Sequence, residues 1–562
     1  MFKPVEMCKV NILALEKHAA ALTRMLGARE LIHLVDATAQ SQDRLLTPFW
    51  TYDSQKLHQL AEQCEMLMRQ LDVHGSQNDD RLMTLDEISR LLSDIGKHYE
   101  EASSNVDALL TEVNSTSQEL ARNREDLTEK KPLEERLAAF EKRLAEGRGA
   151  LRRLADEHGS TLRTIKGRLA DLTLLESVKG KYGRLKRLVC ISGWIPKDAE
   201  ATIKEIVAES TGGTGVVEVI PATLDARGHR GGEKVPTRMR GNAFTRPFQM
   251  LVMNFGIPCY NEIDPSLFFG ISFVLMFGYM FGDIGQGLVL VLAGLWAKFT
   301  RRKLDDFVRD AGMLLVMCGI CAMLFGVAYG SVFGYEHLFE SVWLNPMKSA
   351  DVPELLLTAV GIGTVFTSLA IIINIVNHIR SRKIYDGTVE SFGIVGLLFF
   401  WFCLFLGVWL MTGHEFSTWM YVPLGLPLAL LFIREPLHSI LHHQPPFEGG
   451  LLGVLLESSL GLMETLTGYF SSTVSFVRVG AFAISHGALC FAVFTLADMM
   501  DDIPASGLAK ALIIIFGNVL IICFEGMVAM VQCVRLEYYE LFGKYFGGDG
   551  IPYKPFSLEK EE

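Results

Sequence analysis

Two arginines interrupt the longest apolar stretches of this 562-residue chain, and they constrain its fold more than any other feature. Arg478 lies in SSTVSFVRVGAFAISHGALCFAVF, which is otherwise broken only by His486. Arg535 ends the run ALIIIFGNVLIICFEGMVAMVQCVR, whose only other charge is Glu525. A guanidinium keeps its charge inside a protein, and insertion scales put its cost at the bilayer centre at about 2.5–3.5 kcal/mol. A membrane helix that retains such a charge usually lies on an ion path.

The composition divides the chain into a polar and an apolar half. Residues before about 250 are rich in Glu, Lys, Arg, Asp and Leu, whereas long uncharged stretches follow. We therefore predict a cytoplasmic domain over 1–258 and a membrane domain over 259–562. The formal net charge of −11 argues against nucleic acid as a partner. The N-terminal sequence has no long apolar core, so we expect no signal peptide and a reducing environment for the polar half.

Eight segments are predicted to span a membrane, since each approaches or exceeds the roughly 20 apolar residues that a spanning helix needs. They are residues 265–282, 284–297, 311–335, 355–379, 391–413, 416–433, 449–497 and 511–534, the last continuing past Arg535. The second is short and follows the first directly, which indicates a tight hairpin. The last two exceed the bilayer thickness, so we expect them to be strongly tilted or broken.

Basic side chains predict the orientation of these spans. They follow the second, fourth and sixth spans, while the intervening loops are poor in Lys and Arg. The positive-inside rule then places both termini in the cytoplasm, and we expect a prokaryotic plasma membrane. The close pair Cys318 and Cys321 lies in an apolar run and is interpreted as helix packing, because the ten cysteines follow no disulfide or zinc spacing.

The polar half contains a long heptad-like pattern that begins at Leu85 and restarts after Pro132. Thr84 and Glu87 form a plausible capping box just before it. Two long helices joined near residues 128–132 would make an antiparallel coiled-coil hairpin over about 85–172. The alternative is a pair of helices packed in a compact bundle.

Strand and helix patterns lie on both sides of this hairpin. CKVNILALEKHAAALTRMLG reads as a strand and then a helix, and RLVCISGWIPKDAEATIKEIVAEST repeats that order with Pro196 placed to open the helix. VVEVIPAT reads as another strand. The predicted fold class is therefore an α-helical polytopic membrane protein with an N-terminal cytoplasmic α/β and coiled-coil hairpin domain. No G-x-x-x-x-G-K-[ST] phosphate loop occurs in the sequence, so we expect no nucleotide-hydrolysing site and no cofactor.

Titratable groups lie on both sides of Arg478 in the seventh span. Glu464 precedes Arg478 by 14 residues, which corresponds to about 21 Å and a return to within about 40° of one face. His486 lies eight residues beyond Arg478, about 12 Å along the axis. Arg478 could instead form a buried structural ion pair with Glu464 or with Glu525, and His486 could be a packing histidine.

The eighth span repeats this arrangement. Glu525 precedes Arg535 by ten residues, about 15 Å, and Gln532 shares the face of Arg535 one turn earlier. Gln532 could also serve only as an interhelical hydrogen bonder. Titratable groups at levels on both sides of the arginines suit two offset half-paths with a positive barrier between them. His438, His442 and His443 resemble a metal cluster, but without carboxylate support they are interpreted as surface histidines, and no metal site is predicted.

The chain resembles the membrane stator subunit of rotary V-type and A-type ATPases, which is called subunit a, or subunit I in bacteria and archaea. The resemblance covers nearly the whole chain and rests on motifs in the family's order. These are SGWIP (192–196), RPFQMLVMNFGIPCYNEIDPS (246–266), FGYMFGDIGQG (277–287) with Asp283 at the turn, LFGVAYGSVFGYE (324–336), SFVRVGAFAISHG (475–487) and FEGMVAMVQCVRLEYYELFGKYFGGDGIPYKPFS (524–557).

The resemblance implies roles for the intramembrane polar residues. Arg478 and Arg535 match the two arginines that face the rotating ring, and Glu464, His486 and Glu525 match half-channel residues. Gln532 stands where some members carry a histidine, which weakens a proton-relay role at that position. The polar half is also shorter than in many relatives.

The implied function is ion-translocating and non-catalytic. A stator of this kind carries H⁺ or Na⁺ between two half-channels and a ring of proteolipid subunits with membrane-embedded carboxylates. Its other partners are the lipid bilayer, the peripheral stalks, and the central stalk with the ATP-hydrolysing sector. A self-contained secondary transporter is a rival, but it predicts internal repeats that the sequence lacks. A coiled-coil membrane scaffold is a second rival, and buried arginines argue against it.

Overall fold

The computed structural model describes most of the chain and divides it into two compact units. The described residues are 4–37, 47–49, 54–76, 83–122, 127–222, 229–230, 233–300, 306–335, 341–381, 387–388, 390–413, 420–434, 450–500 and 506–557. One unit comprises Met7–Pro221 with Lys554–Glu562, and the other comprises Met1–Glu6 with Ala222–Tyr553. We call them the sheet unit and the helical unit.

The sheet unit is built on one six-stranded antiparallel sheet with the order β3-β4-β5-β1-β6, in which β2 also pairs with β5. Its strands are β1 (Met7–Leu15), β2 (His33–Val35), β3 (Thr47–Pro48), β4 (Gly183–Leu185), β5 (Leu188–Pro196) and β6 (Val216–Pro221). Its helices are α1 (Ala19–Arg29), α3 (Ser54–Gln70), α4 (Leu85–Arg122), α5 (Leu127–Lys179) and α6 (Glu200–Thr211), with short 3-10 turns at Glu16–His18 and Lys197–Ala199.

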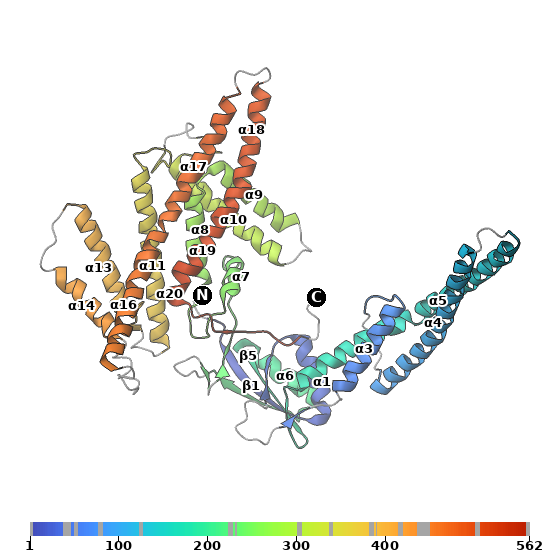
Figure 1. The fold of residues 1–562 in the computed structure, drawn as a ribbon. Coiled ribbons are helices and arrows are strands. Elements are labelled where there is room, and N and C mark those ends of the chain that lie inside the picture. The colour runs from blue at the N-terminus through green and yellow to red at the C-terminus, as the bar shows by residue number, and fades with distance from the viewer. Residues whose placement is uncertain are drawn as a thin grey trace. The chain divides into compact units, whose positions relative to one another are not determined.

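The predicted strand-then-helix segments are present in this unit. Val10, Ile12 and Ala14 are buried at alternate positions of β1, as expected for a strand with one face on the core. Helices α1 and α6 pack together and share a core with the sheet (Figure 1). Pro196 ends β5 with an extended backbone and opens the 3-10 turn that leads into α6. One sheet thus contains the strands that were predicted on both sides of the hairpin.

Helices α4 and α5 lie side by side as the predicted hairpin, and α3 packs against α5 (Figure 1). The capping box is confirmed, since the Thr84 amide donates to Glu87 Oε2 at 2.9 Å and the Glu87 amide donates to Thr84 Oγ1 at 3.3 Å. The hydrogen bond from the Thr84 backbone lowers the pKa of Glu87. The predicted junction at 128–132 is wrong, because α5 begins at Leu127 and contains Pro132. A proline this close to a helix start removes only one backbone hydrogen bond.

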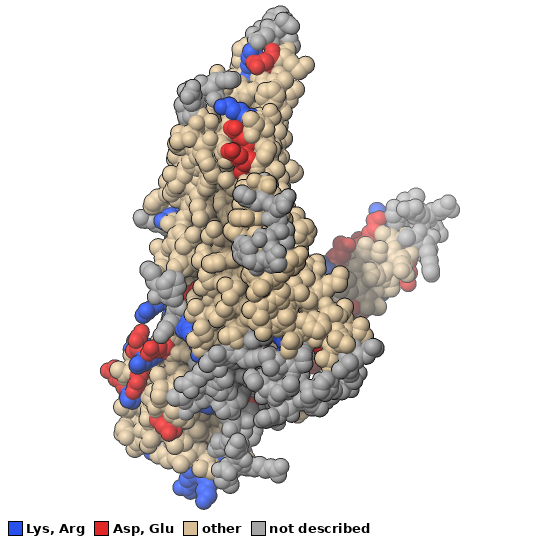
Figure 2. All heavy atoms as spheres, turned by 90° about the vertical axis from the view of Figure 1, so that its left-hand side faces the viewer, with Lys and Arg blue, Asp and Glu red and all other residues tan. Residues whose placement is uncertain are grey.

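The helical unit contains four helical segments long and apolar enough to cross a membrane, as judged over its described residues. They are Phe307–Tyr329, Val352–Arg380, Gly453–Asp498 and Gly507–Tyr545. Four shorter apolar helices accompany them: Ser266–Met280, Ile284–Phe299, Ile394–Leu410 and Tyr421–Phe432. Figure 2 shows that most of the visible surface of this unit carries neither basic nor acidic side chains. The chain is therefore a mostly helical membrane protein, and the count of eight spans stays a prediction.

The elements of this unit follow one another in a chain of helices. They are α7 (Arg246–Phe255), α8 (Ser266–Met280), α9 (Ile284–Thr300), α10 (Asp306–Tyr329), α11 (Val352–Arg380), α13 (Ile394–Met411), α14 (Tyr421–Phe432), α16 (Gly450–Ser475), α17 (Val477–Asp498), α18 (Ser506–Leu520), α19 (Gly526–Arg535) and α20 (Gly543–Tyr545). Two π-helical segments, η4 (Ile521–Glu525) and η5 (Leu536–Phe542), flank α19. Short strand pairs join β7 (His229–Arg230) to β8 (Glu233–Lys234) and β9 (Pro236–Thr237) to β10 (Ile551–Pro552).

Both of the longest spans depart from a regular α-helix, where the sequence predicted spans that are strongly tilted or broken. Helix α16 ends at Ser475 and α17 begins at Val477, with Phe476 as a fully buried turn residue between them. The second long span passes through the two π-helical segments. A π-turn inserts an extra residue into the helix and changes which face the following side chains occupy. The interruptions therefore lie beside the arginines.

Helices α9 and α10 approach so closely that their backbones meet at glycines. A Cβ on Gly294 would lie 2.5 Å from the carbonyl oxygen of Gly312, and one on Gly319 would lie 2.7 Å from that of Gly287. Small residues at seven-residue intervals on both helices permit this contact, which is how membrane helices gain packing energy without a hydrophobic driving force. Cys318 and Cys321 are buried on α10, in line with their interpretation as packing residues.

We predict that Gly294→Ala lowers the stability of the helical unit by about 1–3 kcal/mol, because the added methyl group meets backbone that cannot move aside. The matched control is Gly407→Ala on α13, where a Cβ meets nothing within 4 Å. The measurement is the thermal transition of the purified protein in detergent. Equal transitions for the two variants would show that the α9–α10 contact is not close.

Candidate functional site

The two arginines occupy the interrupted regions of the long spans. Arg478 is the second residue of α17, directly after the break at Phe476, and its side chain is half-buried. Arg535 is the last residue of α19, directly before the π-helical segment η5, and it is exposed. The charge of Arg535 acts on Arg478 by Coulomb interaction, as does that of Glu540. The fold therefore brings two like charges from different spans into one electrostatic neighbourhood.

Neither guanidinium forms an ion pair with any residue that the structure describes. The alternative in which Arg478 pairs with Glu525 is not formed, because the Glu525 carboxylate is bound to His486. The alternative with Glu464 is not formed either, since Glu464 is exposed on α16. Glu540 acts on Arg478 without forming an ion pair with it, so neither guanidinium is directly neutralised by a described carboxylate.

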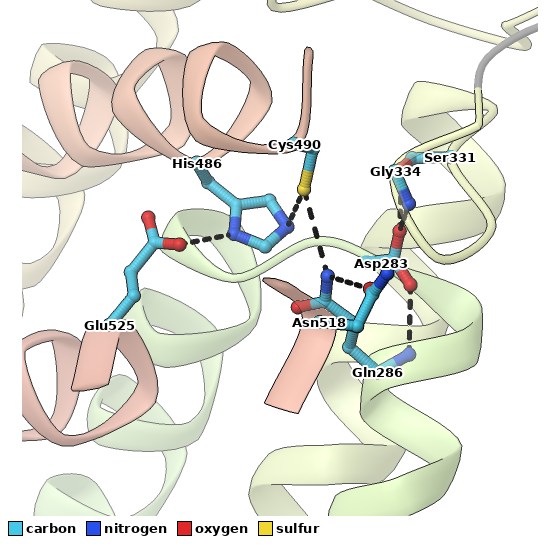
Figure 3. Close-up of polar contacts among 8 residues, drawn as sticks. All are labelled: Asp283, Gln286, Ser331, Gly334, His486, Cys490, Asn518 and Glu525. Atoms are coloured by element: carbon cyan, nitrogen blue, oxygen red, sulfur yellow. Dashed lines mark hydrogen bonds and ion pairs between the residues drawn. The ribbon is translucent and has the colours of Figure 1, made fainter. Parts of the chain in front are cut away.

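His486 and Glu525 are brought together from two spans into a buried pair (Figure 3). His486 Nδ1 lies 2.9 Å from Glu525 Oε2, and the two residues are only 4% and 5% exposed. The His486 ring also packs against the ring of Phe281, with centroids 4.8 Å apart. Such a pair can share or exchange a proton while it is shielded from bulk water.

The π-helical segments position two of these side chains. Glu525 is the last residue of η4, and η5 begins directly after Arg535. π-turns are frequent at functional sites, where they redirect a side chain that a regular helix would place elsewhere. The amino-acid sequence carried no signal for either segment, since the hydrophobic pattern continues through both.

Gln532 is half-buried on α19, and its Oε1 has no hydrogen-bond partner among the described residues. Sequence reasoning missed two further buried groups near the end of the same span. Glu537 is fully buried, and neither carboxylate oxygen has a hydrogen-bond partner within the described ranges. Lys544 is also buried, and its Nζ donates to Ser472 Oγ on α16 at 2.8 Å. Both are single ionisable residues near the chain end, outside the apolar runs that drew attention to the arginines.

A polar cavity of about 390 Å³ lies in the helical unit, where α11 ends beside α20. Its lining includes Glu262, Asn377, His378, Glu390, Lys544 and Tyr545. The Glu262 carboxylate accepts the Cys259 amide at 3.0 Å, and burial raises the pKa of Glu262 above its ordinary value. The cavity lies beyond Arg535 along the eighth span, whereas the His486–Glu525 pair lies before it.

The predicted surface histidines His438, His442 and His443 lie outside the described residues. Within the described ranges, no group of three or more His, Cys, Asp or Glu side chains could hold a metal ion. The arrangement therefore offers fixed positive charge, a buried histidine–carboxylate pair and a polar cavity.

The comparisons with known proteins all find similarity to membrane subunits of V-type and A-type ATPases. Residues 179–360 match the family model described as the V-type ATPase 116kDa subunit family. The chain is 24% identical to A-type ATP synthase subunit I of Methanocaldococcus jannaschii, over 70% of this chain and 58% of the relative. It is 24% identical to the protein of the same name from Pyrococcus horikoshii, over 76% of this chain and 62% of the relative.

A third relative is A-type ATP synthase subunit I of Aeropyrum pernix, with 28% identity over 66% of this chain and 57% of the relative. The chain thus spans less than two thirds of the length of these archaeal proteins.

Proposed function

Because the chain belongs to the V-type and A-type ATPase family of membrane subunits, subunit a or subunit I, we propose that it is the stator of a rotary ATPase. In this role it passes H⁺ or Na⁺ between two half-channels and a ring of carboxylate-bearing subunits. It couples that movement to ATP hydrolysis or synthesis on other subunits and hydrolyses no nucleotide itself.

One observation carries the proposal: Arg478 and Arg535 interact electrostatically with each other and have no ion-pair partner among the described residues. Two guanidiniums close enough to repel each other would gain from an anion supplied by another chain. A carboxylate on a neighbouring rotor subunit is such an anion. Because Arg535 is exposed, it can face a partner without a rearrangement of its own helix.

The half-channel residues fall on opposite sides of the arginines. His486 and Glu525 belong to the side where α17 ends and α18 begins, which we assign to the exterior. Glu464 and the polar cavity belong to the side where α11 and the eighth span end, which we assign to the cytoplasm. Gln532 lies one turn from Arg535 on α19, and its Oε1, which lacks a hydrogen-bond partner among the described residues, can accept from water at the barrier.

The electrostatics of the arginines account for the transfer. A ring carboxylate is neutral, protonated or ion-bound, while it faces lipid, because an uncompensated charge there is costly. Near Arg478 and Arg535 the positive charge favours its ionised form, so the ion leaves into one half-channel. A new ion then binds from the other half-channel before the ring rotates further. The fixed charges also oppose a leak, since a cation that crossed directly would meet them.

The remaining assignments complete the stator. We propose eight spans with both termini in the cytoplasm of a prokaryotic cell. The hairpin of α4 and α5 binds peripheral stalks and resists torque, while the membrane unit contacts the ring. The central stalk and the ATP-hydrolysing sector are the other partners within the complex.

We predict that Arg478→Ala abolishes ATP-driven ion uptake into vesicles that contain the assembled complex, because the ring carboxylate is no longer ionised at the barrier. The matched control is Arg309→Ala, an exposed arginine at the start of α10. Uptake is measured per assembled complex. Normal uptake by the Arg478 variant would refute the proposed role.

We predict that Arg535→Gln impairs ion uptake more than it impairs attachment of the ATPase sector, because this exposed side chain contributes charge rather than packing. Uptake and sector content are measured on the same membranes. Equal loss of both would instead assign Arg535 a role in folding.

We predict that deletion of residues 85–172 detaches the ATP-hydrolysing sector from the membrane, since the arm provides the stalk attachment. The measurement is ATPase activity on washed membranes, normalised to the amount of the deleted chain in them. Retention of that activity would contradict the arm assignment.

A further inference from the structure

Gln286 is a fully buried polar residue in the first turn of α9, within the motif FGYMFGDIGQG from which the sequence analysis singled out only Asp283. Its backbone amide donates to Asp283 Oδ1 at 2.8 Å, the usual contact of a helix N-cap residue. Its side chain crosses to two other helices. Nε2 lies 2.9 Å from Asn518 Oδ1 on α18 and 3.6 Å from Cys490 Sγ on α17 (Figure 3).

The orientation of both amides follows from one backbone carbonyl. Asn518 Nδ2 donates to the carbonyl oxygen of Ile514 at 3.0 Å, and that oxygen can only accept. The Asn518 side chain must therefore present Oδ1 to Gln286, and Gln286 must present Nε2 in return. The two N–H groups of Gln286 are thus directed to Asn518 and to Cys490.

Cys490 connects Gln286 to the candidate site. Its sulfur accepts from Gln286 and lies 3.9 Å from His486 Nε2, one helical turn earlier on α17. Since the sulfur is already an acceptor, its S–H is free to point at Nε2. An imidazole that accepts at Nε2 carries its hydrogen on Nδ1, which faces Glu525 Oε2 at 2.9 Å.

The surrounding loop holds this chain of contacts in place. Asp283 accepts from Ser331 Oγ at 2.6 Å and from the backbone amides of Phe333 and Gly334 at 2.9 and 2.7 Å. Gly334 has a positive φ of 76°, and a Cβ there would lie 2.5 Å from the Cβ of Cys490. The same carboxylate therefore caps the helix of Gln286 and anchors the loop that packs against Cys490.

The carbonyl oxygen of Gln286 is the one atom of its amide without a partner. Gln286 Oε1 is buried and receives no hydrogen bond from the residues that the structure describes. An orphaned buried acceptor of this kind calls for a donor such as water.

We propose that Gln286 is a positioning residue of the exterior half-channel, acting through Cys490 to fix which nitrogen of His486 carries the hydrogen toward Glu525. The proposal rests on the proposed function and extends the exterior path from two residues to five. Gln286, Cys490 and Asn518 are the added members, contributed by α9, α17 and α18.

The first test replaces Gln286 with Leu, which keeps the size of the side chain and removes its hydrogen bonds. ATP-driven ion uptake per assembled complex should fall roughly tenfold, as for the loss of a supporting hydrogen-bond partner. Gln249→Leu is the matched control, since Gln249 lies on α7 with a buried Nε2 that has no partner among the described residues. Uptake by Gln286→Leu equal to that of Gln249→Leu would overturn the proposal.

Two further variants separate positioning from packing. Gln286→Glu has nearly the same shape but donates only when protonated, so uptake should recover as the medium is acidified. In a Cys490→Ala background, adding Gln286→Leu should lower uptake little further, because each change alone already breaks the link from Gln286 through Cys490 to His486. A flat pH response, or losses that simply add, would assign Gln286 to packing alone.

The same preparation distinguishes the two levels of failure. If Arg478→Ala abolishes uptake while Gln286→Leu does not lower it, the stator function stands and this inference fails. If Arg478→Ala leaves uptake intact, the proposed function fails first.

Discussion

The repulsion between Arg478 and Arg535 is the interaction on which the proposed mechanism depends. The two charges lie on different spans, and neither forms an ion pair with a carboxylate among the described residues. A structural arginine in a membrane would normally be neutralised within its own bundle, because an unpaired charge is costly there. The fold instead binds Glu525, the other charge in the apolar run of Arg535, to His486. The positive charge is thereby left available for an anion on another chain.

Irregular helix geometry is the means by which two long spans present these groups together. The break at Phe476 lies two residues before Arg478, and the π-helical segments lie at Glu525 and directly after Arg535. A regular helix would distribute side chains at intervals of 100° from end to end. Each interruption resets that register, so a buried carboxylate and an exposed guanidinium can lie on one span. The close glycine contact between α9 and α10 fixes the position of the neighbouring helix that contributes Gln286.

Local patterns in the sequence were sufficient for the helices, the hairpin and the arginines. The capping box of Thr84 and Glu87 could be predicted because its two residues are three positions apart. The junction near Pro132 was misplaced, because α5 begins before Pro132 and continues through it. The Gln286–Asn518 pair could not be found in this way, because 232 positions separate its members. Glu537 and the π-turns were missed for a related reason: burial and helix register are decided by tertiary packing rather than by the local pattern.

In the proposed mechanism, the two sides of the arginines differ in how ions would reach the ring. On one side, His486 and Glu525 are sealed in the bundle and joined to Cys490 and Gln286 by directed contacts. On the other side, Glu464 is exposed and a polar cavity of about 390 Å³ adjoins Lys544. Water can fill a cavity of that size, so under the proposed function ions on that side would need only to diffuse. Under the same proposal the sealed side would transfer ions through fixed groups, so substitutions there should affect transport more than equivalent changes around the cavity.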